Sequence, residues 1–445
     1  MNYEQSIEYL KTIEYPYEIL PPEEISFDAI KNASGVTFEK ITNYIYLSKF
    51  KPPKSKYLGL YIIDRDIMNI CHSLSSKYSM SARIHSRRYD SLSAYDYWVE
   101  NKDKVLSQAG KQLITYKDTH LLVNLPVDMG GTPSETNYLG LQHECALSLF
   151  RLGIPASFAS NLVVKVIKDY FKDLTNVRVL DISAGWGDRL LACCSLDVEY
   201  TACDPNTALV EPYKKIIDKY GTLQTTETTE TTETTETTEP TKKQIVHCLP
   251  FEDFLSTQSG GTYNCLFSSP PFFDLEIYST ENTQSSVRYP TLKMWLDDFL
   301  KTCLRNSNTV LEDGAWIFLH MNDIDVKGKI DSSGKKITQD RSLNYVQNVV
   351  QWVESTLNWQ FVGVYGFAVK DKEDKMSETV EIRAEKNKKL LEPTKFIKKF
   401  SKGLRCNNFG DIMSQPLWVF QKKTQETPET QEAKRILAKK LIIDG

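Results

Sequence analysis

The sequence lacks several features that would assign it to a particular class of protein. Its nine cysteines include no CxxC pair, and Cys193 and Cys194 are adjacent, a spacing that suits neither a disulfide framework nor a zinc site. We therefore expect reduced thiols packed as small hydrophobic side chains, and no metal. No apolar run approaches the roughly 20 residues that a membrane-spanning helix needs.

The first twenty residues also lack the basic segment and apolar core of a signal peptide. We expect a soluble, intracellular protein, cytoplasmic or nuclear. The chain has no strong charge of either sign, with a formal net charge of −4. A nucleic-acid partner would therefore have to bind a local basic patch. With 445 residues, 41% hydrophobic and 11% aromatic, the chain is long enough for about two domains with a substantial core.

Residues 1–130 give mixed signals and predict a separate N-terminal α+β region. Basic and aromatic side chains alternate within it, at Lys77, Tyr78, Arg83, His85, Arg87, Arg88, Tyr89, Tyr95, Tyr97 and Trp98. Such interleaving suits phosphate contacts combined with base stacking. A solvated basic face over an ordinary aromatic core explains the pattern at least as well.

A second basic segment lies near the C-terminal end of the chain. Residues 386–405 hold eight Lys or Arg against one acid, Glu392. From the two basic segments we take Arg83, Arg87, Arg88, Lys398 and Lys399 as candidate nucleic-acid contacts. The oligomeric state is left open.

From about residue 154 helical and strand patterns alternate. Strands are expected in 177–183, 198–204, 243–249, 263–269, 314–321, 359–369 and 416–423. A helix is expected in 154–171, with Pro155 in its first turn, and further helices are expected between most of the strands, one of them in 291–306. This alternation predicts an α/β fold with a mainly parallel sheet covered on both faces. The last two strands lack a strong helix between them, so the final strand is expected to enter antiparallel.

The predicted second domain spans 131–422 and carries two insertions. Residues 222–243 include five Thr-Thr-Glu triplets at 225–239, which hold no hydrophobic side chain and are expected to form a dispensable loop. The other insertion is a basic loop at 370–405. A charged tail, 423–445, follows the domain.

The strongest chemical signal follows the first strand of this domain, in the segment DISAGWGDR. Gly185 and Gly187 would let the backbone pass close to a ligand, and the next helix presents free N–H groups. The third glycine of the dinucleotide fingerprint is missing, because Leu190 stands there, and this disfavours a dehydrogenase. Asp181 and the two glycines are therefore candidate cofactor-binding residues in the crevice of a doubly wound sheet.

Further candidates follow the second and third strands. Asp204 stands at the tip of the second strand, where a carboxylate can accept hydrogen bonds from ribose hydroxyls. A helix N-cap is the structural alternative for this residue. After the third strand, Phe251 could pack on an adenine ring, and Glu252 or Asp253 could bind its amino group. Capping explains those two acids equally well.

The fourth strand leads into Ser269-Pro270-Pro271-Phe272. Two consecutive prolines fix a rigid loop at the carboxyl end of the sheet. With SAGWGDR and CDPN, this segment resembles the motif set of class I S-adenosylmethionine-dependent DNA or RNA amino-methyltransferases over about 154–422, and more loosely methylases of phage and large viruses. The resemblance implies a Rossmann-like, seven-stranded sheet, S-adenosylmethionine as cofactor, and a DNA or RNA substrate.

The resemblance also implies roles for Ser269, Pro270, Pro271 and Phe272. The Ser269 hydroxyl and the Pro270 carbonyl would accept hydrogen bonds from the exocyclic amino group of the base, while Phe272 stacks on the extruded ring. Serine in the first position suits cytosine N4 enzymes, whereas the order of the motifs suits adenine N6 enzymes, so the base stays open. A methyltransferase acting on protein glutamine or a small molecule, and a non-catalytic binding subunit, remain alternatives.

Overall fold

The computed structural model describes residues 3–17, 20–46, 48–88, 91–117, 154–223, 243–254, 262–326, 341–371, 403–404 and 411–424, with six helical residues between 141 and 149. The Thr-Thr-Glu triplets, Lys398 and Lys399, most of the basic loop and nearly all of the charged tail lie outside these residues. In the part described, no helix combines the length and apolar character needed to cross a membrane. Seven of the eight cysteines described are buried, and none of the eight is in a disulfide.

A central sheet contains the seven strands expected from the sequence. They run in the order β7-β6-β5-β8-β10-β14-β13. Their bounds are β5 Arg178–Asp181, β6 Glu199–Cys203, β7 Gln244–His247, β8 Tyr263–Ser268, β10 Leu311–Leu319, β13 Trp359–Lys370 and β14 Ile412–Lys422. Strand β14 is antiparallel to both β10 and β13, which confirms the expected direction of the last strand. The Rossmann-like α/β fold of the prediction is thus confirmed.

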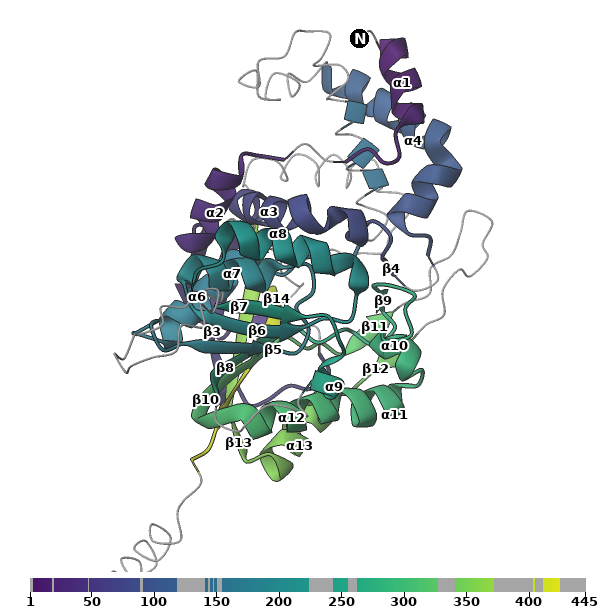
Figure 1. Cartoon of the computed structure of the whole chain (residues 1–445). Helices are drawn as coiled ribbons and strands as arrows, with labels where there is room; N and C mark the ends of the chain where they lie inside the picture. The colour runs from purple at the N-terminus through teal and green to yellow at the C-terminus, as the bar shows by residue number, and fades with distance from the viewer. Residues whose placement is uncertain are drawn as a thin grey trace, which may run out of the picture.

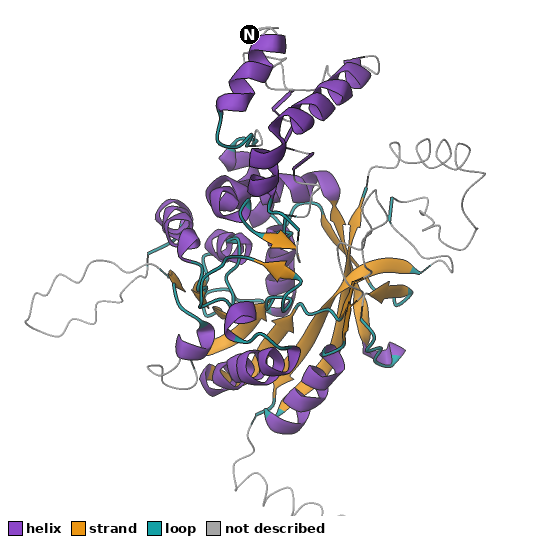
Figure 2. Cartoon of the chain, turned by 90° about the vertical axis from the view of Figure 1, so that its right-hand side faces the viewer, coloured by secondary structure: helices purple, strands orange, loops and turns teal. Residues whose placement is uncertain are grey.

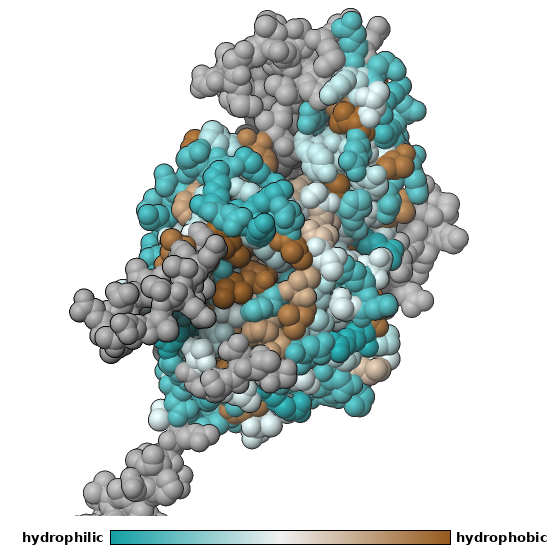
Figure 3. Space-filling model, viewed as in Figure 1, coloured by the Kyte–Doolittle hydropathy of each residue, from teal (hydrophilic) through white to brown (hydrophobic). Residues whose placement is uncertain are grey.

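Helices cover both faces of the sheet (Figures 1 and 2). One face packs against α6 Ser160–Tyr170, α7 Asp188–Leu196 and α8 Val210–Tyr220, and the other against α12 Lys301–Val310 and α13 Val346–Thr356. Strand β8 is apolar and buried along most of its length, because neither of its faces reaches water. On the face shown in Figure 3, the coloured surface is mostly hydrophilic, and hydrophobic side chains gather near its middle.

Two helices differ from the sequence expectation. Helix α6 begins at Ser160, so Pro155 precedes the helix instead of occupying its first turn. The helix expected in 291–306 begins with α11 Leu292–Met294 and continues through a π-helical stretch, η6 Trp295–Leu300, into α12. Such π turns occur frequently at functional sites, and Phe299 of this one lines the pocket described below.

Much of the N-terminal region is not a separate domain, which corrects the prediction. Strand β3 Tyr57–Asp64 extends the sheet in parallel beside β13, and β1 Val36–Glu39 forms its edge. A third strand, β2 Tyr44–Tyr46, pairs with β14. Helices α2 Glu23–Lys31 and α3 Arg65–Arg83 contribute to the same core as α6 and α7. These elements bury their apolar side chains by packing onto the main sheet and its helices. The domain boundary predicted at residue 130 lies outside the described residues.

A smaller helical part of the N-terminal region has its own core. Figure 1 shows helices α1 Tyr3–Thr12 and α4 Ala94–Lys117 side by side. Trp98 of α4 is fully buried in their core. The remaining short elements lie around the sheet: η1 Lys54–Lys56, β4 Arg87–Arg88, η4 Thr207–Leu209, α9 Phe251–Phe254, β9 Glu276–Ile277, α10 Ser285–Arg288, β11 Ile324–Val326 and β12 Arg341–Leu343. The pairing of β4 with β9 connects the N-terminal region to the loop after β8.

Candidate active site

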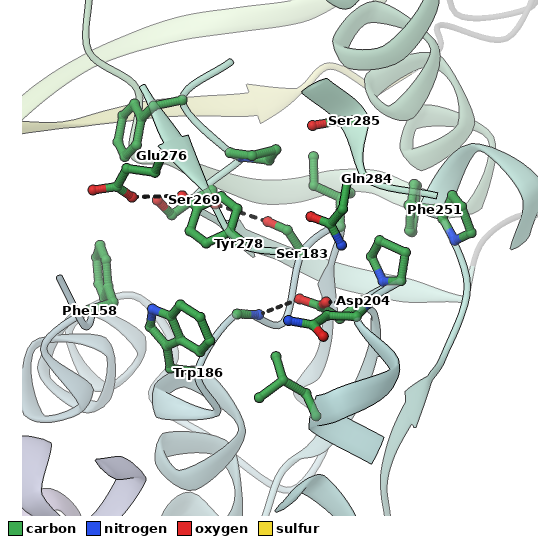
Figure 4. Close-up of a pocket in the computed structure, with 18 of the residues that line it drawn as sticks. Phe158, Ser183, Trp186, Asp204, Phe251, Ser269, Glu276, Tyr278, Gln284 and Ser285 are labelled. Carbon is green, nitrogen blue, oxygen red and sulfur yellow. Dashed lines mark hydrogen bonds between the residues drawn. The ribbon is translucent and has the colours of Figure 1, made fainter. Parts of the chain in front are cut away.

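A pocket of about 170 Å³ lies where the strand order reverses, between β5 and β8. In open α/β sheets this is the place where ligands bind, outside the carboxyl ends of the strands. Its wall is built by the segments that follow β5, β6, β7, β8 and β10, together with residues 156–158 ahead of α6 (Figure 4). Five loops that are distant in the sequence therefore meet at one point.

The glycine-rich turn after β5 forms one side of the pocket. Gly185 and Gly187 have φ values of +64° and +90°, a region that side chains with a β-carbon disfavour. Gly185 lines the pocket. Gly187 does not, because it begins α7 and faces α8, where an added β-carbon would lie 2.9 Å from Cδ1 of Ile216. The expectation that both glycines line the pocket is therefore corrected for Gly187.

Asp181 also lies behind the pocket wall and not on it. Its carboxylate is fully buried and pairs with the guanidinium of Arg189, with 2.6 Å between Oδ2 and Nε. It also accepts hydrogen bonds from the hydroxyls of Tyr200 (2.8 Å) and Ser268 (2.7 Å). Because these partners come from α7, β6 and β8, Asp181 fixes the geometry of the turn. The expectation that it lines the pocket is corrected in the same way.

Asp204 lies on the wall and is bonded to the glycine turn. Its Oδ2 accepts from the Gly185 N–H at 2.9 Å, and its Oδ1 accepts from the Asn206 N–H at 3.0 Å. Burial raises the pKa of this carboxyl to about 6. The helical turn that follows is capped by Asn206, which accepts from the Ala208 N–H, so the N-cap alternative for Asp204 is wrong.

Phe251 and Glu252, at the start of α9, both line the pocket. Phe251 is 2% exposed, so its ring forms a wall of the cavity. Glu252 accepts hydrogen bonds from Arg288 (3.1 Å) and from the Tyr289 hydroxyl (3.0 Å). Burial raises the pKa of the Glu252 carboxyl. The two residues thus offer an aromatic surface beside a hydrogen-bond acceptor.

The Pro-Pro loop forms the opposite side. Ser269, Pro271 and Phe272 line the pocket, whereas Pro270 is buried and does not. The Ser269 carbonyl accepts from the Ser183 hydroxyl at 2.9 Å, which joins this loop to the one after β5 across the switch point (Figure 4). Phe273 has a positive φ of +50° and buries its ring edge-to-face on Trp295. This unusual conformation reverses the chain directly after Phe272.

Several pocket residues were missed by the sequence analysis. They are Phe158, Trp186, Glu276, Tyr278, Gln284 and His320. Trp186 stands within the glycine motif and Glu276 four residues after the Pro-Pro motif, so both could have been proposed from those positions. His320, at the end of β10, carried no such signal.

His320 contacts Phe272 edge-on, with ring centroids 5.6 Å apart. Its Nδ1 lies 2.8 Å from the Pro416 carbonyl, which can only accept, so Nδ1 carries the proton and Nε2 is an acceptor. Burial lowers the pKa of this imidazole to about 4. The ring is therefore neutral near pH 7.

The three candidate nucleic-acid contacts among the described residues, Arg83, Arg87 and Arg88, lie in three different environments. Arg83 is 2% exposed and donates from Nε and Nη2 to the Pro155 carbonyl at 3.0 and 2.7 Å. It is therefore a buried structural residue, and its assignment as a surface contact is wrong. Arg88 pairs with the Glu276 carboxylate at 3.0 Å. Arg87 lines a second cavity.

No protein-family model and no curated protein matches the chain. Among solved structures it is similar to a candidate S-adenosylmethionine-dependent methyltransferase from Listeria monocytogenes, at 11% identity over 59% of this chain and 98% of that one, with a TM-score of 0.30. A methyltransferase from Methanosarcina mazei matches at 10% identity over 58% and 98%, with a TM-score of 0.29. The [4+2]-cyclase SpnF matches at 9% over 60% and 83%, with a TM-score of 0.31.

Similarity at this level says nothing about substrate. The Rossmann-like α/β fold is assigned from the strand order of this chain and the position of its pocket.

Proposed function

We propose that the chain is an S-adenosylmethionine-dependent methyltransferase that methylates the exocyclic amino group of adenine (N6) or cytosine (N4) in DNA or RNA. The proposal rests mainly on one observation. A single pocket at the switch point is lined by Gly185, Asp204, Phe251 and the Ser269–Phe272 loop, which are spread over some 90 residues of the sequence.

The residues of the pocket fit this cofactor. At Gly185 no β-carbon covers the backbone, so a ligand can approach it closely, and Asp204 offers a hydrogen-bond acceptor for ribose hydroxyls. Phe251 and Glu252 offer a flat surface and an acceptor for an adenine. Among the described residues, Nε2 of Gln284 is buried on this wall without a hydrogen-bond partner, as expected for a group that meets a ligand. When bound, S-adenosylmethionine supplies an activated methyl group. Asp181 and Gly187 act indirectly, by holding the turn.

The other side of the pocket fits a planar base. Phe272 provides a stacking surface, and the Ser269 hydroxyl an acceptor for an amino group whose lone pair is otherwise conjugated to the ring. The Pro270 carbonyl is the second proposed acceptor; Pro270 does not lie on the wall, so Pro270→Ala should cost less than Ser269→Ala. Positioning for in-line transfer accounts for most of the catalysis, since the methyl group is already activated. Neutral His320 adds an acceptor nitrogen beside Phe272.

The proposal is tested with labelled S-adenosylmethionine, pools of DNA and RNA, and mass spectrometry of the nucleosides. We expect label in N6-methyladenosine or N4-methylcytosine, or in the corresponding deoxynucleosides. Label in protein or small molecules alone would favour the alternative substrates.

Two variants test the Pro-Pro loop in single-turnover reactions. Phe272→Ala should slow transfer by about 5- to 150-fold, corresponding to a stacking energy of about 1–3 kcal/mol. Ser269→Ala should also slow transfer, since it removes one of two acceptors. Both should bind the cofactor as the wild type does, because neither residue is proposed to contact it. Full transfer rates in both variants, on a substrate that the wild type methylates, would rule out this loop as the catalytic site.

A further inference from the structure

A second cavity adjoins the candidate active site. Its volume is about 420 Å³, and Asn206 and Tyr278 belong to the walls of both cavities. The other wall residues come from the end of α3, from β4 and the residues before it, from η4, and from β9 and the loop after it. The N-terminal region and the loop that carries the Pro-Pro motif therefore form most of this cavity. The Tyr278 and Asn206 side chains, which belong to both walls, separate it from the first pocket.

The wall of the second cavity is rich in hydrogen-bond donors. It includes Arg87, His85 and the hydroxyls of Ser81, Ser279 and Thr280, and its described residues include no Asp or Glu. The Asn206 side-chain oxygen already accepts from the Ala208 N–H, which leaves its amide nitrogen to donate.

Glu281, which follows the wall residue Thr280 in the sequence, forms its hydrogen bonds outside the cavity. Its carboxylate accepts from the backbone N–H and the hydroxyl of Thr207. A cavity with a guanidinium, an imidazole and several donors, and no carboxylate, fits an anion such as a phosphodiester.

The two arginines of strand β4 point to opposite faces of the strand, and of the two only Arg87 lines a cavity. Side chains alternate along a strand, and directly opposed residues of an antiparallel pair point to the same face. Arg88 stands opposite Glu276, which lines the first pocket. The Glu276 carboxylate neutralises the charge of the Arg88 guanidinium. Arg87 stands opposite Ile277, and both line the second cavity. Within the part of the chain that the structure describes, Arg87 has no ion pair, so its charge is available to a ligand.

We propose that the second cavity binds the backbone phosphate next to the target base, so that the substrate is a polynucleotide and not a free nucleoside or nucleotide. This inference rests on the function proposed above and specifies its substrate class. The base would enter the pocket lined by Phe272, and the flanking phosphate would lie beyond Tyr278 against Arg87.

The experiment measures the binding of fluorescent DNA and RNA oligonucleotides by anisotropy at several salt concentrations. Arg87→Ala should weaken oligonucleotide binding by about tenfold and lower the salt slope by about 0.7, as expected for the loss of one phosphate contact to a single strand. Arg87→Lys should recover part of the affinity, because the charge remains while the planar donor fork is lost. Arg305→Ala is the matched control: it removes an exposed arginine of α12 that lines neither cavity and should bind like the wild type.

A second variant guards against a folding defect in Arg87→Ala, which thermal melting would reveal. Ser279→Asp places a negative charge in the same cavity and should weaken oligonucleotide binding by more than tenfold through repulsion of the phosphate. Wild-type affinity and salt slope in the folded Arg87 and Ser279 variants would overturn the inference. An equal loss for adenosine and cytidine monophosphates would overturn the assignment to a polynucleotide, since the cavity would then serve the phosphate of a single nucleotide.

Methyl transfer, measured separately, distinguishes this inference from the proposed function. If oligonucleotide binding depends on Arg87 but the wild type methylates no nucleic acid, the proposed function fails and the phosphate site stands. If the wild type methylates oligonucleotides and Arg87→Ala binds them unchanged, only the present inference fails.

Discussion

The two sides of the pocket are built in different ways. The proposed cofactor side consists of Gly185, Asp204 and Phe251, which lie in the segments that follow β5, β6 and β7. Its main hydrogen bonds join neighbouring loops of the same sheet, as between Asp204 and Gly185. The other side, which carries Ser269 and Phe272 and is proposed to hold the base that accepts the methyl group, is called the acceptor side. It is held by contacts between segments distant in the sequence: Phe158 with His320 at 5.6 Å between ring centroids, and Arg88 with Glu276.

This difference indicates what each side contributes. The cofactor side is inseparable from the sheet, so substitutions there should affect stability and cofactor binding together. The acceptor side depends on the N-terminal extension, so substitutions in β4 should alter transfer while the sheet remains intact.

The largest effect is expected behind the cofactor side. Asp181→Ala would leave the buried guanidinium of Arg189 without its counter-ion, which should lower the free energy of unfolding by about 3–5 kcal/mol. Urea denaturation measures this. The control is Glu211→Ala, which removes an exposed pair with Lys215 and should cost at most about 0.5 kcal/mol. Equal losses in the two variants would show that Asp181 does not hold the turn.

The next effect is on cofactor binding. Asp204→Ala should weaken it by about 1.5–3 kcal/mol, because charged hydrogen bonds to ribose are lost. Since the pKa of Asp204 is about 6, the carboxyl loses its charge as the pH falls through 6, and wild-type affinity should fall with it. Calorimetry between pH 5 and 8 should show this fall in the wild type and a flat profile in Asp204→Asn. A wild-type affinity that is constant over this range would contradict the role of the carboxylate.

The same carboxyl has the opposite effect on the stability of the ligand-free chain. Its folded pKa of about 6 lies above the ordinary 3.8, so the folded state binds more protons than the unfolded state between these values. Its contribution to stability is therefore present below about pH 4 and is lost as the pH rises through 6. Asp204→Asn should remove this dependence from the unfolding free energy.

A smaller effect is expected on the acceptor side. Arg88→Ala leaves the Glu276 carboxylate with the Tyr278 hydroxyl, 2.7 Å away, but without its cation. Because Arg88 is partly exposed, we expect only about a threefold to tenfold loss of the single-turnover rate, with unchanged cofactor affinity. Arg88→Lys should restore part of the rate. A loss of cofactor affinity as large as the loss of rate would mean that the two sides are not separable.

The smallest effect is expected for the Thr-Thr-Glu triplets, which lie outside the described residues. Deletion of residues 225–239 should leave the melting temperature and cofactor affinity close to those of the wild type, because loop-closure entropy changes slowly with loop length. A large fall of either quantity would assign the repeat a role that its composition does not suggest.

The sequence alone determined the order of the seven strands and main helices from residue 160, the glycine turn after β5, and the loops that carry Asp204, Phe251 and Ser269. These features depend on short-range patterns: apolar runs, glycine at positive φ, and fixed φ at proline. The tertiary structure alone decided that β3 joins the main sheet, that Arg83 is buried against Pro155 while Arg87 lines a cavity, and that His320 meets Phe272. Each of these depends on which distant segment a residue faces, and the periodicity of a strand or helix does not encode its partner.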